Sequence, residues 1–307
     1  MASFLKTLSN VTKRGARSVR TGGRRLGAAW RQLQFGTSGC ITMLVPDLNN
    51  PYFILLASHV EQALRAGGYT LLLLSANNDR QRETELLELL RRQQPQALLW
   101  VPLGGQSAAR LPYPVVTIDQ SLPYYDSVQA DQQLGGVLLA QHIISLGHSC
   151  VGVLSGANNS ESRRQRHQGF YRTAEGKFTI AWDIEVPLSL ELNDRVAAQL
   201  SEGDVSLIVA PNDAVAIGVI RALRARGIAV PGDMSILGFD DVPWAALLDP
   251  PLSTVQQPIR DIAARAVHLL TARIQDPQCP VSHVVLPVHF VVRRSAIPIS
   301  AFFTTEY

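Results

Sequence analysis

The stretch ITMLVPDLNNPYF (41–53) contains an apolar strand, a turn and the start of a helix in immediate succession. Ile41–Val45 is a continuous apolar run, which is typical of a strand buried in a parallel sheet, and the pair Pro46-Asp47 ends it. Asn50 then offers a capping side chain, and Pro51 fits the first turn of a helix. The stretch therefore predicts a parallel strand that is followed by a covering helix.

The same unit repeats along the rest of the chain. Further strands are predicted at Tyr69–Leu74, Ala97–Val101, Pro114–Ile118, Val151–Leu154, Leu207–Ala210, Met234–Leu237 and His283–Val292. Further helices are predicted at Asp79–Gln94, Gln132–Leu146, Arg163–Thr173, Asp213–Arg226 and Ile259–Ile274, two of which end at the glycines Gly147 and Gly227. Because strand and helix alternate, we expect an α/β fold whose parallel sheets are covered by helices on both faces.

Polar side chains follow several of the predicted strands. They are Asp47, Asn49 and Asn50 after the first strand, and later Asp119, Asn212, Asp213, Asp240 and Asp241. Sheets of this kind bind ligands beyond the carboxyl ends of their strands, so these positions predict a binding site.

The sequence lacks the usual signatures of enzymes, cofactor sites and metal sites. GxSxG, GxxxxGK[ST] and GxGxxG do not occur, and the seven histidines are not part of an HExxH motif. The cysteines Cys40, Cys150 and Cys279 are too widely spaced for a metal knuckle or a disulfide framework. The adjacent carboxyls of Asp240 and Asp241 usually point apart, which disfavours an acid/base pair. We therefore expect a protein that is not an enzyme and holds no metal or cofactor.

The first 38 residues differ in charge from the rest of the chain. They carry eight basic side chains and no acidic one: Lys6, Lys13, Arg14, Arg17, Arg20, Arg24, Arg25 and Arg31. Without these eight, 20 Lys and Arg face 25 Asp and Glu, although the whole chain is +3. A local basic block suits a polyanion partner such as DNA, but a solvated tail or an organelle targeting peptide has the same composition.

Apolar runs in the chain are all shorter than the roughly 20 residues that a membrane span requires. The early charges are not followed by the apolar run of a secretory signal. We therefore expect a soluble protein of the reducing cytoplasm, with no membrane partner.

Several segments together resemble the LacI/GalR family of bacterial transcriptional regulators. They are ITMLVPDLNNPYF (41–53), VVTIDQSLP (115–123), DQQLGGVLLAQHIISLGH (131–148), RQRHQGF (164–170), APNDAVAIGVIRALRARGIAVPGDMSILGFDDVPWAALLDPPLSTVQQP (210–258) and VRRS (292–295). The resemblance implies two Rossmann-like parallel-sheet subdomains of the periplasmic binding protein-like type I fold, joined by three crossovers around an effector cleft. It also implies a homodimer and a hinge motion that couples effector to DNA.

By this resemblance the effector-binding and dimerisation domain spans 39–295, and a tail of 296–307 follows it. One subdomain would comprise 39–147 and 243–275, and the other 148–242 and 280–295.

The resemblance also assigns effector contacts to seven residues: Tyr52, Phe53, Asp119, Arg166, Asn212, Asp240 and Gln257. An aromatic face stacks on a ring, an arginine fork donates to hydroxyls or a carboxylate, and a carboxylate accepts from vicinal hydroxyls. Alternatives remain for some of them, because Phe53 could be a core residue and Asp119 or Asn212 a turn residue. We assign the helix cap near Asp240 to Asp241, and a surface position to Arg163 and Arg164.

The family's helix-turn-helix segment is not recognisable ahead of this domain. GRRLGAAWRQLQFGTSG (23–39) is similar to the family's hinge region, which implies a degenerate hinge helix in which Arg31 and Leu33 contact DNA. The expected function is a repressor that responds to a small sugar or sugar-like metabolite. The alternative is a truncated or degenerate repressor that binds a small molecule without specific DNA binding.

Overall fold

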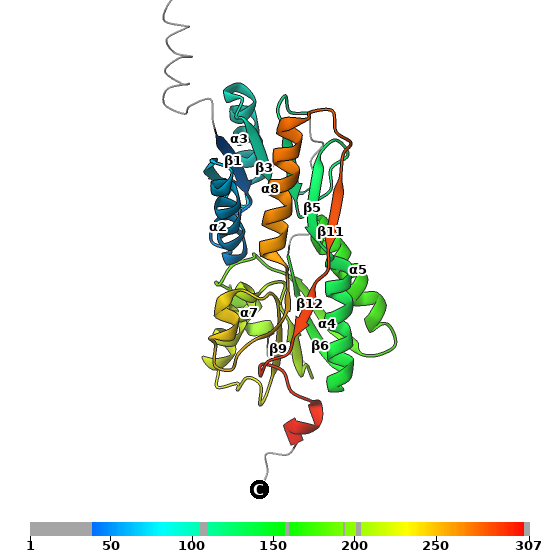
Figure 1. The fold of residues 1–307 in the computed structure, drawn as a ribbon. Coiled ribbons are helices and arrows are strands. Elements are labelled where there is room, and N and C mark those ends of the chain that lie inside the picture. Colours follow the sequence, from blue (N-terminus) through cyan, green and yellow to red (C-terminus); the bar gives the residue numbers. More distant parts are fainter. Residues whose placement is uncertain (1–38, 105–109, 157–159, 193, 201–203, 304–307) are drawn as a thin grey trace, which may run out of the picture.

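A computed structural model describes residues 39–104, 110–156, 160–192, 194–200 and 204–303. These residues form two lobes, one above the other in Figure 1, and each lobe is built around a six-stranded sheet. The predicted class, two parallel-sheet subdomains joined by three crossovers, is confirmed.

The upper lobe contains an entirely parallel sheet with the strand order β11-β5-β4-β3-β1-β2. Its strands are β1 (Cys40–Val45), β2 (Thr70–Ser75), β3 (Ala97–Trp100), β4 (Val115–Ile118), β5 (Asp126–Ala130) and β11 (His283–Leu286). Its helices are α2 (Pro51–Ala66), α3 (Arg80–Gln93) and α8 (Ile259–Gln275). Helices α2 and α8 lie side by side although they are far apart in the sequence (Figure 1).

The lower lobe has the strand order β12-β10-β9-β8-β6-β7, with only β12 antiparallel to its neighbour. Its strands are β6 (Cys150–Ser155), β7 (Thr179–Glu185), β8 (Leu207–Val209), β9 (Ser235–Asp240), β10 (Ser253–Gln256) and β12 (His289–Val291). Its helices are α4 (Gln132–Leu146), α5 (Glu161–Ala174), α6 (Asp194–Gln199), α7 (Asp213–Arg224) and the 3₁₀ turns η1 (Pro243–Ala246) and η2 (Ile299–Phe303).

Helix boundaries follow the capping signals of the sequence. The Asn50 side chain accepts a hydrogen bond from the Tyr52 amide, with Pro51 in the first turn of α2. Gly147 adopts φ 77° at the end of α4, a left-handed conformation that glycine adopts without steric penalty. Helix α7 ends two residues earlier than predicted, at Arg224.

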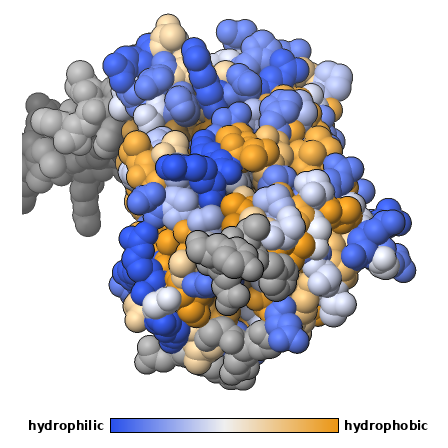
Figure 2. Space-filling view, turned by 90° about the horizontal axis from the view of Figure 1, so that it is seen from below, coloured by the Kyte–Doolittle hydropathy of each residue, from blue (hydrophilic) through white to orange (hydrophobic). Residues whose placement is uncertain are grey.

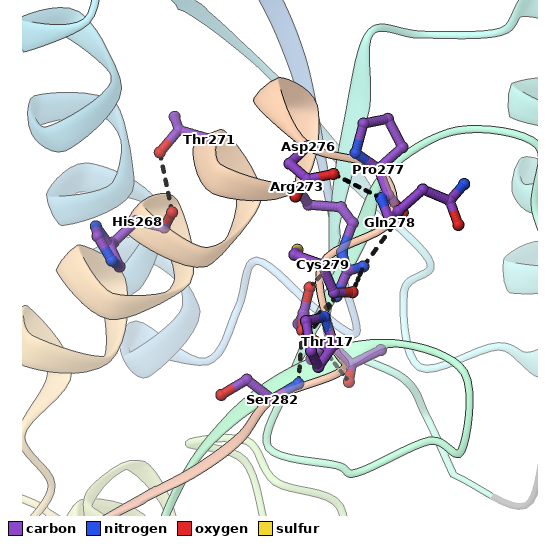
Figure 3. Close-up of polar contacts among 11 residues, drawn as sticks. Thr117, His268, Thr271, Arg273, Asp276, Pro277, Gln278, Cys279 and Ser282 are labelled. Atoms are coloured by element: carbon purple, nitrogen blue, oxygen red, sulfur yellow. Dashed lines mark hydrogen bonds and ion pairs between the residues drawn. The ribbon is translucent and has the colours of Figure 1, made fainter.

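Three strands and one α-helix were not predicted from the sequence: β5, β7, β10 and α6. The β5 sequence DSVQA looks too polar for a strand, yet all five residues are buried because the Asp126 carboxylate is paired with Arg273. Arg273 reaches from the end of α8 toward Cys279 and Ser282, as Figure 3 shows. Local pattern could not reveal this strand, since its partner lies far along the chain.

The predicted single strand His283–Val292 is wrong. It is two strands, β11 in the upper sheet and β12 in the lower sheet, and the chain crosses between lobes at 287–288. The other two crossovers lie between β5 and α4 and between β10 and α8.

These crossovers correct the predicted division into subdomains. Segment 132–147 was assigned to the first subdomain, but α4 packs mainly against α5 in the lower lobe. Strand β10 was also assigned to the first subdomain and lies in the lower sheet, whereas β11 lies in the upper one. The first two crossovers are predicted at the wrong place because β5 and β10 are not recognised as strands, and the third because 283–292 is predicted as a single strand.

Buried apolar side chains form a core cluster that extends across both lobes, from Leu56 of α2 to Phe239 of β9. Hydrophobic and hydrophilic side chains are interspersed on the lower end of the molecule (Figure 2). Among the described residues, no helix is both long and apolar enough to cross a membrane.

Candidate ligand-binding cleft

A cavity of about 410 Å³ lies between the two lobes, within the range of small-molecule sites. The structure brings all seven predicted effector residues to its wall: Tyr52, Phe53, Asp119, Arg166, Asn212, Asp240 and Gln257. Most of them follow the carboxyl end of a strand or begin a helix there, as parallel α/β topology requires. Residues far apart in sequence thus line one cavity.

A chain of hydrogen bonds joins four polar side chains along the lower wall of the cleft. Gln257 Nε2 donates to Asp240 Oδ1 at 2.7 Å, and Gln132 Nε2 donates to Gln257 Oε1 at 3.0 Å. Arg166 donates to Gln132 Oε1 through Nε at 3.2 Å and Nη2 at 2.7 Å. The two glutamines therefore hold the arginine and the carboxylate apart, although both belong to one network.

Arg166 is fixed from several sides. Its guanidinium lies over the Phe239 ring, 3.3 Å from the ring centroid, and Nη1 donates to the Pro211 carbonyl. Burial lowers the pKa of Arg166 to about 10, against the opposing attraction of Asp240 and Asp119. The side chain remains cationic at neutral pH in a site shielded from water.

Two glycines allow helices α4 and α5 to cross closely enough for Gln132 to reach Arg166. A Cβ on Gly136 of α4 would lie 2.0 Å from the Arg166 carbonyl, and one on Gly169 of α5 would lie 2.0 Å from the Gln133 carbonyl. Neither contact is sterically possible, so both helices need glycine at their crossing. The resulting close approach brings Gln132 within hydrogen-bond distance of Arg166.

Asp119 lies on the upper wall and accepts a hydrogen bond from the Tyr52 hydroxyl at 3.1 Å. Its backbone has φ 64°, in the left-handed region, which aspartate tolerates better than most residues. Burial raises the pKa of Asp119 to about 6, although Tyr52 and Arg166 act in the opposite direction. The Asp119 carbonyl also accepts from Ser162 of the lower lobe at 3.0 Å, so this loop touches both lobes.

Asp240 is the last residue of β9, with φ 112° and only 5% of its surface exposed. Burial and, next, the nearby Asp213 raise its pKa well above the ordinary range. The expected helix cap at Asp241 is wrong, because Val242 precedes η1 and no side chain caps it. Asp241 instead pairs with Arg293 at 2.6 Å.

Asn212 combines the two roles considered for it. Its Oδ1 caps α7 by accepting from the Val215 amide at 2.8 Å, while its buried Nδ2 has no hydrogen-bond partner among the described residues. A buried amide donor without a partner is costly, and this one lies on the cleft wall. Asn212 therefore offers a donor to whatever occupies the cleft.

Phe53 likewise serves both as a core residue and as part of the cleft wall. It is 8% exposed, belongs to the main core cluster, and packs edge-on against Tyr52 with ring centroids 5.2 Å apart. Other apolar side chains line the cavity from both lobes, among them Val101, Leu103, Leu139, Val153, Phe170, Val186 and Leu188. The cleft can thus cover the apolar face of a ligand, while the polar side chains of the cleft form hydrogen bonds with ligand hydroxyls.

Sequence reasoning missed Gln132 and Arg163, which also line the cleft. Gln132 begins α4 two residues after the end of β5, so recognition of that strand would have identified it. Arg163 was assigned to the surface, but it lies one helical turn before Arg166, and residues at that spacing share a helix face.

Within the described ranges, no group of three His, Cys, Asp or Glu side chains could hold a metal ion. The predicted DNA contacts Arg31 and Leu33 lie outside the residues that the structure describes.

Comparisons with known proteins agree with this architecture. A family described as periplasmic binding protein-like domain matches residues 140–296. The HTH-type transcriptional regulator MalR of Streptomyces coelicolor is 30% identical over 283 residues, 86% of this chain and 82% of that protein. The HTH-type transcriptional regulator DegA of Bacillus subtilis is 29% identical over 275 residues, 85% of this chain and 81% of that protein.

Among solved structures, a LacI family transcriptional regulator from Enterococcus faecalis with bound ribose has a TM-score of 0.78 to this chain. It is 28% identical, and the match covers 85% of this chain and 99% of that one.

Proposed function

Because this chain belongs to the LacI/GalR family of transcriptional regulators, we propose that its interlobe cleft binds a small sugar or sugar-like metabolite that controls repressor activity. The observation that carries the proposal is the network from Arg166 through Gln132 and Gln257 to Asp240. It presents a cation and a carboxylate in a buried cavity without letting them neutralise each other.

The chemistry of the cleft suits a polyhydroxylated ligand. Asp240 and Asp119 offer carboxylate oxygens that accept hydrogen bonds from hydroxyls, while Asn212 offers a free amide donor. Phe53 provides an apolar face next to them. The ribose bound to the regulator of E. faecalis supports this ligand class.

Binding can reach the rest of the protein because the cleft is lined from both lobes. Tyr52 and Asp119 belong to the upper lobe, whereas Arg166 and Asp240 belong to the lower one. A ligand that contacts both walls favours the arrangement in which the lobes are close, and three crossovers allow that arrangement to change. This hinge is the proposed route from ligand to DNA affinity.

The remaining partners follow from the family. We propose DNA as the target, because the relatives MalR and DegA are HTH-type transcriptional regulators, and a homodimer in the cytoplasm as the working assembly. Arg31 and Leu33 are the proposed contacts to DNA from the basic segment 1–38. We also propose that the protein does not turn over its ligand, so unchanged sugar should be recovered after long incubation.

A thermal-shift screen with neutral sugars, sugar phosphates and purines tests the cleft. A ligand that binds the folded state alone raises the melting temperature by mass action. We expect at least one sugar to do so, and Asp240→Ala and Arg166→Ala to abolish that shift while remaining folded. Retention of the full shift in both variants would place the binding site elsewhere.

The alternative is a small-molecule binding protein without specific DNA binding. A gel-shift competition at fixed salt separates the two functions, because a regulator must prefer an operator to random duplex by several orders of magnitude. Equal competition by both duplexes would favour the alternative. A change of operator affinity on addition of the screened sugar would favour the regulator.

A further inference from the structure

A second arginine lies beside the sugar site and has an open donor. Arg163 lines the cleft, and its buried Nε has no hydrogen-bond partner in the part of the chain that the structure describes. Its Nη2 donates to Ser155 Oγ at 2.8 Å, which fixes the direction of the guanidinium. Because α5 places Arg163 and Arg166 one turn apart, a single small ligand can reach both.

The acidic side chains around Arg163 are engaged elsewhere. Asp183 accepts from the hydroxyls of Ser155 and Tyr171 at 2.5 and 2.7 Å, and His167 lies 3.5 Å from it. Glu161 accepts from Gln165 and, across the cleft, from the Ser121 amide. Among the described residues, no carboxylate lies within ion-pair distance of Arg163, unlike Arg273 and Arg293.

The two arginines therefore differ in how many hydrogen-bond donors remain for a ligand. Arg166 donates to Gln132 and to the Pro211 carbonyl and stacks on Phe239, so much of its fork is already used by the protein. Among the described residues Arg163 has one acceptor, the neutral Ser155 hydroxyl, whose own proton is directed at Asp183. A partly buried guanidinium in this state favours an anion, because charge-assisted hydrogen bonds are about twice as strong as neutral ones.

We propose that the effector carries an anionic group, a phosphate or a carboxylate, which Arg163 binds while Asp240 and Asp119 hold its hydroxyls. This inference rests on the proposed function and narrows it from sugars in general to sugar phosphates and sugar acids. Arg163 is thus a specificity-determining residue, and the planar fork of its donors matches either anion.

Calorimetric titration of the full chain with matched probes tests this inference. The probes are D-ribose with D-ribose 5-phosphate, and D-glucose with D-glucose 6-phosphate and D-glucuronate. We expect one anionic probe to bind at least about tenfold more tightly than its neutral parent, as a charged hydrogen bond provides. The phosphate and carboxylate arms identify which anion the site prefers.

Three variants assign that preference to Arg163. Arg163→Gln should lose the anionic advantage but keep the affinity for the neutral parent, and Arg163→Lys should retain part of the advantage. Arg164→Gln removes the same charge from an exposed neighbour that does not line the cleft, and should behave as the parent protein.

The outcomes distinguish this inference from the proposed function. Equal affinity for neutral and anionic probes would overturn the inference while leaving a sugar site in place. An equal loss of both affinities in Arg163→Gln would also overturn it, since the residue would then act on the cleft as a whole. Failure of every sugar, neutral or charged, to bind would overturn both.

Discussion

Each lobe buries an arginine near an aspartate, but the two pairs are built differently. In the upper lobe, Arg273 and Asp126 form a brace with Nε to Oδ2 at 2.9 Å and Nη2 to Oδ1 at 3.0 Å. In the lower lobe, Arg166 and Asp240 are linked only through the amides of Gln132 and Gln257.

The two pairs also differ in their surroundings. The brace is completed by protein groups, since the Ser282 amide donates to Asp126 and Arg273 donates to backbone carbonyls of the turn after α8 (Figure 3). Pairing with Asp126 raises the pKa of Arg273, whereas burial lowers the pKa of Arg166 to about 10. Removing one partner of a buried ion pair leaves an uncompensated charge that destabilises the fold, whereas a buried charge without a direct partner is available for a ligand.

The largest expected effect comes from breaking the brace. Arg273→Met leaves the Asp126 carboxylate buried, with a side-chain exposure of only 3%, and without its cation. We expect a loss of about 3–5 kcal/mol in the free energy of unfolding, measured by urea denaturation. Arg65→Met, which removes an exposed pair with Glu61, is the control and should leave the midpoint unchanged. A similar midpoint for the two variants would remove the distinction between brace and surface pair.

A smaller effect is expected from the pH dependence of the cleft. Because the folded-state pKa of Asp119 is raised from 3.8 to about 6, the folded protein holds this proton more tightly than the unfolded chain. Its contribution to stability is complete below about pH 4 and is lost as the pH rises through 6.

Asp119→Asn should remove this contribution to the pH dependence of the free energy of unfolding, on the order of 2 kcal/mol between pH 4 and 7. Urea denaturation at a series of pH values measures it. A slope identical to that of the parent protein would mean that Asp119 does not carry the effect.

The smallest expected effect is a rise in the free energy of unfolding, whereas Arg273→Met lowers it. Asp240→Asn keeps an acceptor for Gln257 Nε2 but removes a carboxyl group whose pKa is raised by burial. We expect the free energy of unfolding of the ligand-free protein at pH 7.5 to rise by about 1 kcal/mol, because a folded-state pKa above the unfolded value costs stability at a pH where the unfolded chain ionises this group. A loss comparable to that of Arg273→Met would show that Asp240 is structural.

Local signals in the sequence predicted most of the fold. The cap at Asn50, the left-handed Gly147 and the apolar runs of β1 and β3 each depend on near neighbours, and the structure has them where expected. Strand β5 was missed because burial of its Asp126 carboxylate depends on pairing with Arg273, which lies more than a hundred positions away in the sequence. The missed strand also shifted the predicted crossover from the start of α4 to its end.

In the candidate site, too, features set by near neighbours in the sequence could be predicted and those set by distant partners could not. Asp119 and Asp240 could be identified because they lie at the carboxyl ends of apolar strands, which a single sequence displays. The link between Arg166 and Gln132 could not, because it depends on the helix crossing at Gly136 and Gly169. Arg163 could have been included, because it lies one helical turn before the predicted effector residue Arg166 and shares its helix face.

Calorimetric titration of Asp240→Asn with a sugar that binds the parent protein, together with its unfolding free energy, tests the central contrast most directly. We predict that affinity falls at least about a hundredfold, because the amide keeps the oxygen that Gln257 uses but replaces the other acceptor oxygen by a donor, while the variant is no less stable than the parent. Unchanged affinity, or affinity lost together with the fold, would contradict the assignment of this cleft to ligand binding.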